Sequence, residues 1–327
     1  MKKNNVLLFS TENDVHADRL ESVNQSSVKF IRLNLDKPKV WGLSFQLGDV
    51  VVDTGDHTFG IDEIQSVFVR RVPNVDSFIK AVAPAYVDYA PYIANQEFAL
   101  FSDCLAILDT YVPFVNPLAT ASKAGKAIQA KVASDVGFIT PDTYIGSNPS
   151  VARKFCEDLI GAQKEVCTKP ISNSMVTIDG EQKTRFTEKL NQDSLAEMNS
   201  LTYCPIIFQG YIEKSYEIRA TVIGSKIYAA KIESQVAGGQ TAVDWRRYNI
   251  PKTPHSPYKF PFSIEQKIFA LHDRLGLIYS SFDFIRTPTG EYVFLETNPF
   301  GQWLWIEDLT GLEISKGIAQ YLASPRE

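Results

Sequence analysis

The chain has few of the residues on which zinc proteins and disulfide-stabilised proteins depend. It contains only four cysteines, which lie far apart and form no CxxC pair: Cys104, Cys156, Cys167 and Cys204. This spacing argues against a zinc site and against a disulfide framework, and it favours a reducing, cytoplasmic environment. The four histidines show no metal-binding spacing either.

Long apolar runs and an excess of basic residues are also missing. No run approaches the length needed to cross a bilayer, and the apolar run in the N-terminal MKKNNVLLFS stops after four residues. We therefore expect a first strand there and no membrane association. A net charge of −5 gives no basis for non-specific nucleic-acid binding. The segment Ile171 to Val176 contains no glycine, so no glycine-rich phosphate loop can be identified in it.

The 327 residues, 44% of them hydrophobic, are enough for two or three domains with buried cores. The first third begins as β-α-β, with strands at Asn5–Ser10 and Val28–Leu33 around a helix near Val15–Val23. A hairpin is indicated around Gly48-Asp49, a further strand at Ser66–Arg70 and a mostly helical stretch at Asp76–Thr110. Pro113 to Pro117 breaks the pattern and marks a domain boundary.

The rest of the chain predicts a small α+β domain followed by a strand-rich one. We expect helices at Thr120–Val136, Asn148–Ile160 and Ser263–Leu275. The first is closed by Gly137, and the second is a capped helix that begins at Asn148. The expected strands are Pro141–Ile145, Lys164–Thr168, Met175–Ile178, Thr184–Thr187, Pro205–Tyr211, Ile218–Ile223 and Ile227–Glu233. Gly180 marks a hairpin turn between two of these strands. The expected domains are residues 1–117, 118–206 and 207–327.

The segment SSFDFIRTPTGEYVFLETNPFGQWLWIE, residues 280 to 307, carries the clearest chemical signal. Two apolar runs flank Thr287 to Gly290, which predicts a β-hairpin. Alternation puts Glu296 and Asn298 on one face of the second strand, and the hairpin brings Asp283 opposite them. Such oxygen ligands suit Mg²⁺ bridging nucleotide phosphates. The alternative is a polar edge strand with an Asx turn at Asn298-Pro299.

Several upstream residues could bind a nucleotide. Lys126 and Lys169 could hold phosphates, although surface lysines are the simpler interpretation of either one alone. In CPIIFQGYIEKSYEIR, Gln209, Tyr211 and Ile212 could flank an adenine ring, and Glu217 could hold ribose hydroxyls. Arginines suit bidentate binding of phosphate or carboxylate, and the candidates are Arg219, Arg246 and Arg247. A structural ion pair with Asp244 is the alternative for Arg246 and Arg247.

The order of these residues resembles the ATP-grasp superfamily. Lys126, TKP at Lys169, the FQGYI hinge, Glu217, Asp283 and Glu-x-Asn at 296 and 298 follow one another as in that family. LETNPFGQWLWIEDLTG, DWRRY, ENDVHAD and VFVRRVP are similar to motifs of the microviridin-type peptide ligases, also called graspetide synthetases. The resemblance implies an α+β ATP-grasp fold with an N-terminal pre-ATP-grasp α/β domain, a small central α+β domain and a C-terminal β-rich domain.

The resemblance also implies a function. Such ligases phosphorylate Asp or Glu side chains of a ribosomal precursor peptide, which carries a leader, and join the acyl phosphate to a Ser or Thr hydroxyl or a Lys amine. ATP and Mg²⁺ are the expected cofactors, and a homodimer is a candidate assembly. The implied ATP-binding residues are Lys126, Lys169, Gln209, Tyr211, Ile212 and Glu217. The implied catalytic residues are Arg219, Arg247 and Arg246, and the implied metal ligands are Asp283, Glu296 and Asn298.

Some positions depart from the family pattern. Gly210 stands where many relatives carry Glu in the hinge, and Phe300 stands where Asn is commoner in NPxGQW. Ser281 occupies the place of an arginine in the D-alanine ligases of the superfamily, which argues against a dipeptide product. No general base is identifiable, with Asp14, His16 and Glu213 as candidates only. The motif Gly301 to Trp305 is the segment that favours a peptide substrate.

Two other functions fit the same residues. One is a RimK-like ligase that adds a free amino acid to a peptide or small molecule. The other is a non-catalytic module that binds ATP and a peptide, which the retention of the metal ligands and both lysines disfavours. Ring closure removes water from one peptide, whereas ligation adds a residue, so product mass separates the first alternative from macrocyclisation.

Overall fold

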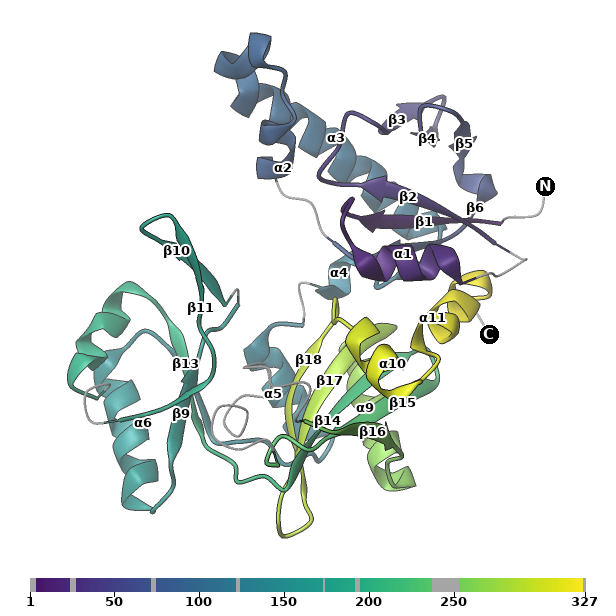
Figure 1. Ribbon diagram of the computed structural model, residues 1–327. Helices are drawn as coiled ribbons and strands as arrows, with labels where there is room; N and C mark the ends of the chain where they lie inside the picture. The colour runs from purple at the N-terminus through teal and green to yellow at the C-terminus, as the bar shows by residue number, and fades with distance from the viewer. Residues whose placement is uncertain are drawn as a thin grey trace.

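The computed structural model describes residues 4–23, 28–71, 75–121, 124–172, 174–191, 195–236 and 253–325. Three groups of strands and helices follow one another along the chain and occupy three parts of the molecule (Figure 1). Across these ranges, no helix is both long enough and apolar enough to span a bilayer.

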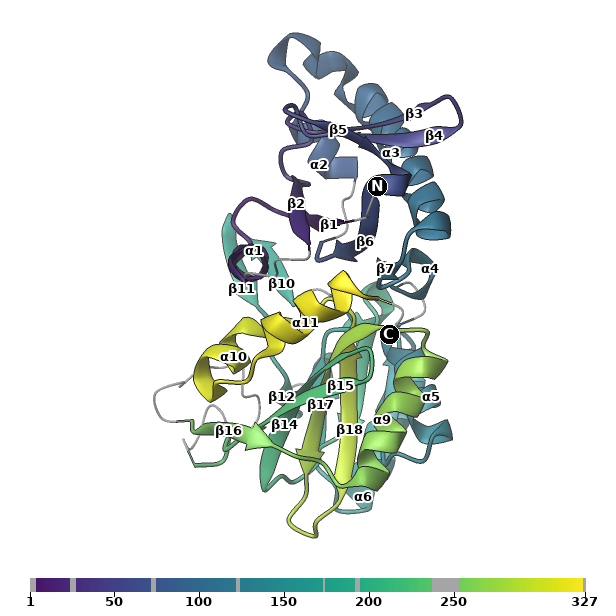
Figure 2. The ribbon, with the colours of Figure 1, turned by 90° about the vertical axis from the view of Figure 1, so that its right-hand side faces the viewer.

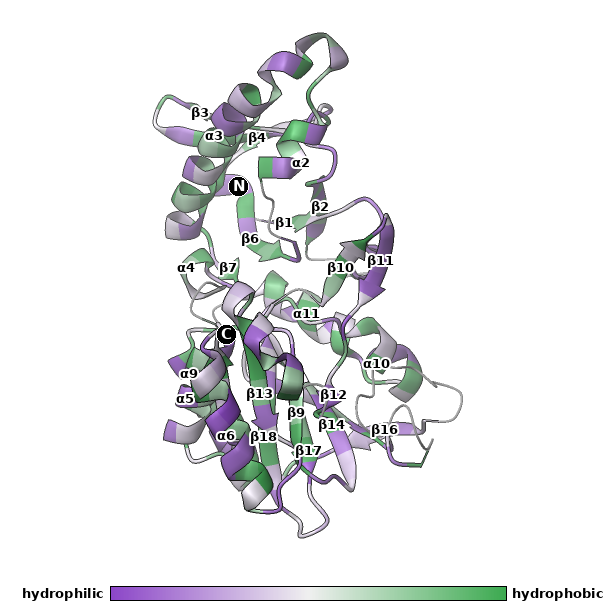
Figure 3. Ribbon diagram, turned by 90° about the vertical axis from the view of Figure 1, so that its left-hand side faces the viewer, coloured by the Kyte–Doolittle hydropathy of each residue, from purple (hydrophilic) through white to green (hydrophobic). Residues whose placement is uncertain are grey.

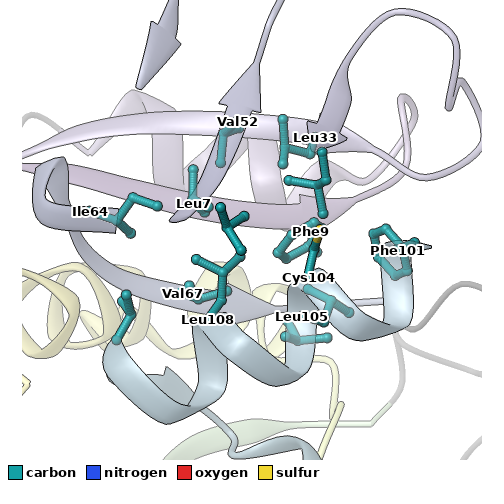
Figure 4. Packing of buried hydrophobic residues seen from close by; sticks show 14 of the residues in the cluster. Leu7, Phe9, Leu33, Val52, Ile64, Val67, Phe101, Cys104, Leu105 and Leu108 are labelled. Atoms are coloured by element: carbon teal, nitrogen blue, oxygen red, sulfur yellow. The ribbon is translucent and has the colours of Figure 1, made fainter. Parts of the chain in front are cut away.

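The N-terminal part is an α/β unit. It contains β1 (Asn5–Ser10), α1 (Val15–Ser22), β2 (Lys29–Asn34), β3 (Gly42–Gln46), β4 (Asp49–Asp53), β5 (Thr58–Gly60), the 3₁₀ turn η1 (Ile61–Glu63), β6 (Ile64–Val69), α2 (Val75–Lys80), the 3₁₀ turn η2 (Pro84–Tyr89), α3 (Ala90–Tyr111), β7 (Phe114–Val115) and α4 (Leu118–Ala121). The order β2-β1-β6-β7 forms a parallel sheet, and β3-β4-β5 forms a small antiparallel one. Alternate apolar residues of β1 and β6 pack on α3, as Leu7 and Val67 do near Leu108 (Figure 4). The predicted β-α-β start and hairpin are confirmed.

The central part is a four-stranded antiparallel sheet covered by one long helix. It contains β8 (Thr143–Gly146), α6 (Pro149–Gly161), β9 (Val166–Lys169), β10 (Met175–Ile178), β11 (Glu181–Thr184), β12 (Glu188–Lys189), the 3₁₀ turn η3 (Glu197–Tyr203) and β13 (Ile206–Gly210). The sheet order is β12-β9-β13-β8, and α6 packs on it with Cys156 and Leu159 buried against Phe208. The Asn148 side chain accepts hydrogen bonds from the first turn of α6, as the predicted cap requires.

The strands β10 and β11 form a separate hairpin, in which an apolar strand lies beside a polar one (Figure 3). The expected second strand, Thr184–Thr187, is wrong. Asp179 and Gly180 both have positive φ, 54° and 80°, and make a two-residue turn, so Glu181 already pairs with Ile178. The expected helix Thr120–Val136 is also wrong at its start, because Gly125 has an extended backbone and α5 (Lys126–Asp135) begins only after it.

The strand β13 crosses the domain boundary expected at residue 206. It pairs with both β8 and β9 along its length, so the central sheet extends to Gly210. The helix α5, by contrast, packs against the C-terminal part of the molecule. We propose that the central domain ends after Gly210, and we keep the boundary near residue 117.

The C-terminal part is a five-stranded antiparallel sheet. It contains β14 (Tyr216–Ile223), β15 (Lys226–Ile232), β16 (His255–Tyr258), α9 (Phe262–Arg274), β17 (Tyr279–Arg286), β18 (Tyr292–Asn298), α10 (Leu304–Thr310) and α11 (Ile314–Ala323). The order is β16-β15-β14-β17-β18, and α5 and α9 lie along one side of it (Figure 2). In β14, Ile218, Ala220 and Val222 face these helices. Alternation therefore turns Glu217 and Arg219 toward the opposite face.

The N-terminal and C-terminal parts share a core. Val6, Leu8 and Phe68 of the parallel sheet belong to one buried cluster with Trp303 and residues of α11. The Ser66 hydroxyl donates to the Leu322 carbonyl oxygen at 2.8 Å. The helices α10 and α11, which sequence reasoning missed, thus pack the C-terminal sheet against the N-terminal one.

Candidate active site

The face of the C-terminal sheet that points away from α5 and α9 lines a cleft toward the central sheet. The cleft is lined by Pro141, Cys167, Lys169, Thr187, Gln209, Gly210, Tyr211, Ile212, Lys214, Glu217, Asp283, Ile285, Leu295 and Glu296. Seven of the predicted site residues are among them: Lys169, Gln209, Tyr211, Ile212, Glu217, Asp283 and Glu296. The structure therefore brings together residues that are more than a hundred positions apart in the sequence.

Four charged side chains form a row at this cleft: Asp283 and Glu296 line it, and Arg219 and Lys126 lie beside them. Arg219 on β14 pairs with Asp283 on β17, and Asp283 pairs with Glu296 on β18. The Arg219 guanidinium donates from Nη1 to Asp283 Oδ2 at 2.7 Å, and Lys126 at the start of α5 donates from Nζ to Glu296 Oε2 at 2.9 Å. The row thus reads cation, carboxylate, carboxylate, cation. The predicted β17–β18 hairpin is confirmed, with Asp283 opposite Glu296.

Two carboxylates directly opposite on adjacent strands repel one another, so this arrangement is unfavourable unless cations lie close to it. Arg219 and Lys126 flank the pair on its two outer sides. A divalent cation between the carboxylates would remove the repulsion, and oxygen ligands suit Mg²⁺. No cluster of three or more His, Cys, Asp or Glu suited to a metal occurs in the described ranges. A metal here would therefore need further oxygens, from Asn298 and from a ligand.

Asn298 has features of both interpretations of its sequence. It ends β18, an edge strand, is exposed, and does not line the cleft. Its Oδ1 accepts a hydrogen bond from the Phe300 amide at 2.9 Å, which is the Asx turn that the alternative interpretation expects. It lies two residues beyond Glu296 and opposite Ser281. The side-chain oxygen has a second lone pair, so the turn does not prevent it from binding a metal.

The other end of the cleft lies at the junction of β13 with the segment that follows it. Gln209 is buried and donates from Nε2 to the Thr143 hydroxyl at 2.8 Å. Burial, followed by the negative charge of Glu217, raises the pKa of Tyr211 to about 12, so its hydroxyl stays protonated near neutral pH. The Lys189 ammonium lies 4.0 Å from the centroid of the Tyr211 ring. These apolar and amide groups provide a surface on which a flat base can pack.

Glu217 lies in the cleft in a buried ion pair with Lys214, and both side chains are less than a tenth exposed. Sequence reasoning identified Glu217 but missed Lys214. A lone lysine in a polar segment gives no signal of burial, because most such lysines point into solvent. Cys167 was also missed as a cleft residue. Burial raises the pKa of its thiol.

The arginines predicted further along the chain, Arg246 and Arg247, lie outside the described residues. Lys126 does not line the cleft itself, but its ion pair with Glu296 brings it to the cleft's edge. Lys169 ends β9 within the cleft wall. The predicted phosphate lysines thus lie on opposite sides of the cleft, Lys126 beside the C-terminal sheet and Lys169 in the central sheet.

The general-base candidates lie elsewhere. Glu213 is exposed and is not among the residues that line the cleft. Asp14 is buried, and although burial alone would raise its pKa, Arg70, Ser10 and the His16 amide together lower it. Burial and the neighbouring Arg70 lower the pKa of His16 to about 4. His16 packs edge-on against Trp303, with ring centroids 4.4 Å apart.

The motif Gly301 to Trp305 contributes to the fold through its first tryptophan. Trp303 is fully buried, and its indole donates to the Ser315 hydroxyl at 2.9 Å. It therefore packs in the shared core, where it cannot contact a peptide. Gln302 is exposed, and its carbonyl oxygen accepts from Arg219 Nη2 at 3.2 Å.

Comparisons with known proteins agree with this architecture. No protein-family model matches the chain. Tetrahydromethanopterin:alpha-L-glutamate ligase from Methanococcus maripaludis is 22% identical over 225 residues, which cover 66% of this chain and 71% of that protein.

Solved structures match over nearly the whole chain. A RiPP-associated ATP-grasp ligase from Chryseobacterium gregarium, in complex with ADP and a leader and core peptide, is 26% identical with a TM-score of 0.83, covering 99% of this chain and 98% of that one. The macrocyclase MdnC from Microcystis aeruginosa MRC, bound with precursor peptide MdnA, is 25% identical with a TM-score of 0.81, covering 98% and 99%. The predicted α+β ATP-grasp fold is confirmed.

Proposed function

We propose that this chain, an ATP-grasp ligase of the graspetide-synthetase kind, phosphorylates Asp or Glu side chains of a ribosomal precursor peptide and closes them into rings. The ring-closing group is a Ser or Thr hydroxyl or a Lys amine of the same peptide. The enzyme uses ATP and Mg²⁺ and releases ADP. The observation that carries this proposal is the row Lys126, Glu296, Asp283 and Arg219, whose two carboxylates line a cleft that also holds Tyr211 and Glu217.

The nucleotide would lie along the cleft with its base at β13. Gln209, Tyr211 and Ile212 would flank the adenine, and Glu217, held by Lys214, would accept from the ribose hydroxyls. Lys169 and Lys126 would contact phosphate oxygens from the two walls. Arg219 would face the transferring phosphoryl group, with Arg247 and Arg246 as further candidates. For the residues that the structure describes, each role fits the chemistry of the side chain and its position in or beside the cleft.

Asp283, Glu296 and Asn298 would hold magnesium, because their oxygens are the hard ligands that this ion requires. When bound, Mg²⁺ neutralises charge on the phosphate oxygens of ATP. Lys126 and Arg219 would also neutralise negative charge on the phosphate oxygens. Their cations are already fixed beside the carboxylates, so little reorganisation is needed as negative charge develops.

The reaction has two steps. First the peptide carboxylate attacks the γ-phosphorus of ATP, the bond from that phosphorus to the bridging oxygen breaks, and ADP leaves. The hydroxyl or amine then attacks the acyl carbon, the bond to the phosphate oxygen breaks, and phosphate departs while the nucleophile loses its proton. Water must be kept from the acyl phosphate. We propose that the β10–β11 hairpin helps to cover it, since Met175, Val176 and Ile178 are about half exposed there.

The peptide partner would be a precursor with a leader and a core rich in Thr, Ser or Lys together with Asp and Glu. Two similar proteins support a precursor peptide as the substrate, since one was solved with a leader and core peptide and the other with a precursor peptide. We further propose a cytoplasmic enzyme that binds neither nucleic acid nor membrane, with a homodimer as a candidate assembly. The four free cysteines support the reducing compartment.

A second function is favoured by one observation. The relative from Methanococcus maripaludis is a tetrahydromethanopterin:alpha-L-glutamate ligase, a name that fits the RimK-like alternative of adding a free amino acid. The two functions differ in the product. Ring closure lowers the mass of the peptide by one water per bond, whereas ligation raises the mass by one residue.

Incubation of the protein with ATP, Mg²⁺ and a candidate precursor peptide, sought in the neighbouring reading frames, tests the proposal. We expect ADP release and stepwise loss of water from the peptide by mass spectrometry. Mass gain in the presence of free amino acids would favour the ligase alternative. The absence of any ADP release would favour a module that binds ATP and peptide without catalysis.

A further inference from the structure

The loop that follows the proposed metal ligands is held by its main-chain oxygens. Pro299 to Gln302 are four consecutive residues, and each carbonyl oxygen accepts a hydrogen bond from a different side chain. The donors are Asn116 to Pro299 at 3.1 Å, Arg70 to Phe300 at 3.0 Å, Tyr279 to Gly301 at 2.6 Å and Arg219 to Gln302 at 3.2 Å. These donors come from β6, β7, β14 and β17 or the residues directly after them. The main chain of this loop is therefore anchored at each of its four residues.

Arg70 is the donor that comes from the N-terminal part and carries a charge. Its side chain has no exposed surface, its backbone amide donates to the Phe9 carbonyl at 2.9 Å, and Asp14 lies 3.4 Å from Nη2. Its guanidinium lies 5.0 Å from the centroid of the Trp303 ring. Burying a charge is unfavourable unless the charge is paired and hydrogen-bonded. Arg70 meets that condition in part: Asp14 lies beside it and Nη1 donates to the loop, whereas Nε and Nη2 are buried without a hydrogen-bond partner.

The loop is coupled to the cleft at both ends. At its start, the Gly301 amide donates to the Asn298 carbonyl at 3.0 Å, and the Phe300 amide donates to the Asn298 side chain. At its end, Gln302 accepts from the same guanidinium that bonds Asp283. A Cβ at position 301 would lie 2.3 Å from the Ser281 side chain, so the glycine packs directly on β17. A shift of the loop would therefore move Asn298 and Arg219.

We propose that Arg70 is a positioning residue for phosphoryl transfer. By holding the Phe300 and Gly301 carbonyls, it keeps Asn298 and Arg219 in place and connects the N-terminal domain to the catalytic cleft. The inference rests on the proposed function. Tyr279 holds the same loop through a single hydroxyl, so substitution of Arg70 or of Tyr279 should have the same kind of effect on catalysis.

Arg19 provides a matched comparison. It also joins the N-terminal part to the C-terminal segment, with hydrogen bonds to Glu307 at 2.7 Å and Asp308 at 2.9 Å. These partners lie on α10, beyond the loop. If Arg70 merely held the two parts together, loss of Arg19 would have the same consequences. If Arg70 positions the loop, only Arg70 and Tyr279 variants should alter the chemistry.

Three variants of the full chain test this: Arg70→Lys, Tyr279→Phe and Arg19→Gln. Lysine keeps a positive charge beside Asp14, but one ammonium cannot reproduce the planar fork of the guanidinium. Two measurements are made on each variant. One is kcat and the KM for ATP with the precursor peptide. The other is the Mg²⁺ midpoint, the Mg²⁺ concentration at which ADP produces half of its maximal increase in Tm. This second measurement needs no peptide.

For Arg70→Lys we expect kcat to fall about 10- to 100-fold with the KM for ATP changed less than about twofold, since small misplacements at a reacting centre have effects of this size. The Mg²⁺ midpoint should rise severalfold. Tyr279→Phe should show the same pattern to a smaller degree, and Arg19→Gln should show neither change. The inference would be overturned if Arg70→Lys and Tyr279→Phe both kept the wild-type kcat and Mg²⁺ midpoint. It would also be overturned if Arg19→Gln showed the same fall in kcat and the same rise in the Mg²⁺ midpoint.

Two other results, a variant that does not fold and a wild-type enzyme that does not modify the peptide, still leave the inference testable. If Arg70→Lys does not fold, Tyr279→Phe, which removes one hydroxyl from a buried ring, decides the question by the same criteria. If the wild-type enzyme does not modify the peptide, the proposed function fails, and the Mg²⁺ midpoint of the ADP complex alone decides whether the loop is positioned by Arg70.

Discussion

Replacing Asp283 with asparagine should abolish the magnesium-dependent stabilisation of the protein by ADP while leaving the fold intact. In the metal-free protein the change weakens a contact with Arg219, whose charge attracts Asp283, but it also removes the repulsion from Glu296 directly opposite. These two effects oppose one another, so we expect the free energy of unfolding without ligand to change by at most about 1–2 kcal/mol. Asparagine has nearly the same size and shape, so packing is preserved.

The Mg²⁺-ADP complex should respond differently. A ligand present at about 100 times its Kd stabilises a protein by about 2.7 kcal/mol, and a 100-fold loss of affinity lowers this to about 0.4 kcal/mol. For a chain of this length the lost stabilisation corresponds to roughly 3 °C in Tm. Turnover should fall at least about 100-fold, because removal of one transition-state contact has effects of that order.

Thermal unfolding with ADP, measured with Mg²⁺ and with EDTA, is the assay. The matched control is Glu291→Gln, an isosteric change at an exposed carboxylate on the same hairpin, outside the cleft. It should retain the full magnesium-dependent increment. An Asp283→Asn protein that keeps this increment, or that forms product at the wild-type rate with saturating Mg²⁺, would refute the metal assignment.

Two further predictions concern the nucleotide site and the core. Glu217→Gln should raise the KM for ATP about tenfold with little effect on kcat. It should also lower the Tm of the free protein, because the Lys214 ammonium stays buried without a carboxylate. An unchanged KM for ATP would exclude a role of Glu217 in binding the ribose. Burial lowers the pKa of His272 to about 4, below the value of about 6.5 expected when unfolded, so the unfolded state binds more protons and stability is lost as pH falls from about 6.5 to 4. This loss of stability approaches about 3 kcal/mol. Urea unfolding of the wild-type protein and of His272→Phe, each at pH 7 and pH 4.5, measures it, and the variant should lack the loss. An equal pH dependence in the wild type and the variant would contradict a buried, neutral His272.

Local sequence patterns predicted the parts of the site that depend on neighbouring residues. Alternation of apolar and polar residues around Thr287 to Gly290 indicated the β17–β18 hairpin, and that hairpin puts Asp283 opposite Glu296. The cap at Asn148 was predicted for the same reason, since its hydrogen bonds reach only residues 150 and 151. The strand after Gly180 was misplaced because only the dihedral angles of the turn determine where the pairing resumes.

Contacts between distant parts of the chain could not be predicted in this way. Arg70 meets Gly301 across 231 positions, and Lys126 meets Glu296 across 170. The strand β13 joins the central sheet because its partners β8 and β9 lie there, although its own sequence would suit either neighbouring domain. The motif around Trp303 indicated a ligase family correctly, but its burial shows that the tryptophan packs the core.

The most direct test of the central claim is the mass of the precursor peptide after incubation with the wild-type protein, ATP and Mg²⁺. The proposed function predicts one molecule of ADP for each molecule of water lost, and no loss with Asp283→Asn. A peptide whose mass is unchanged while ATP is bound, or whose mass increases by an added amino acid, would contradict macrocyclisation.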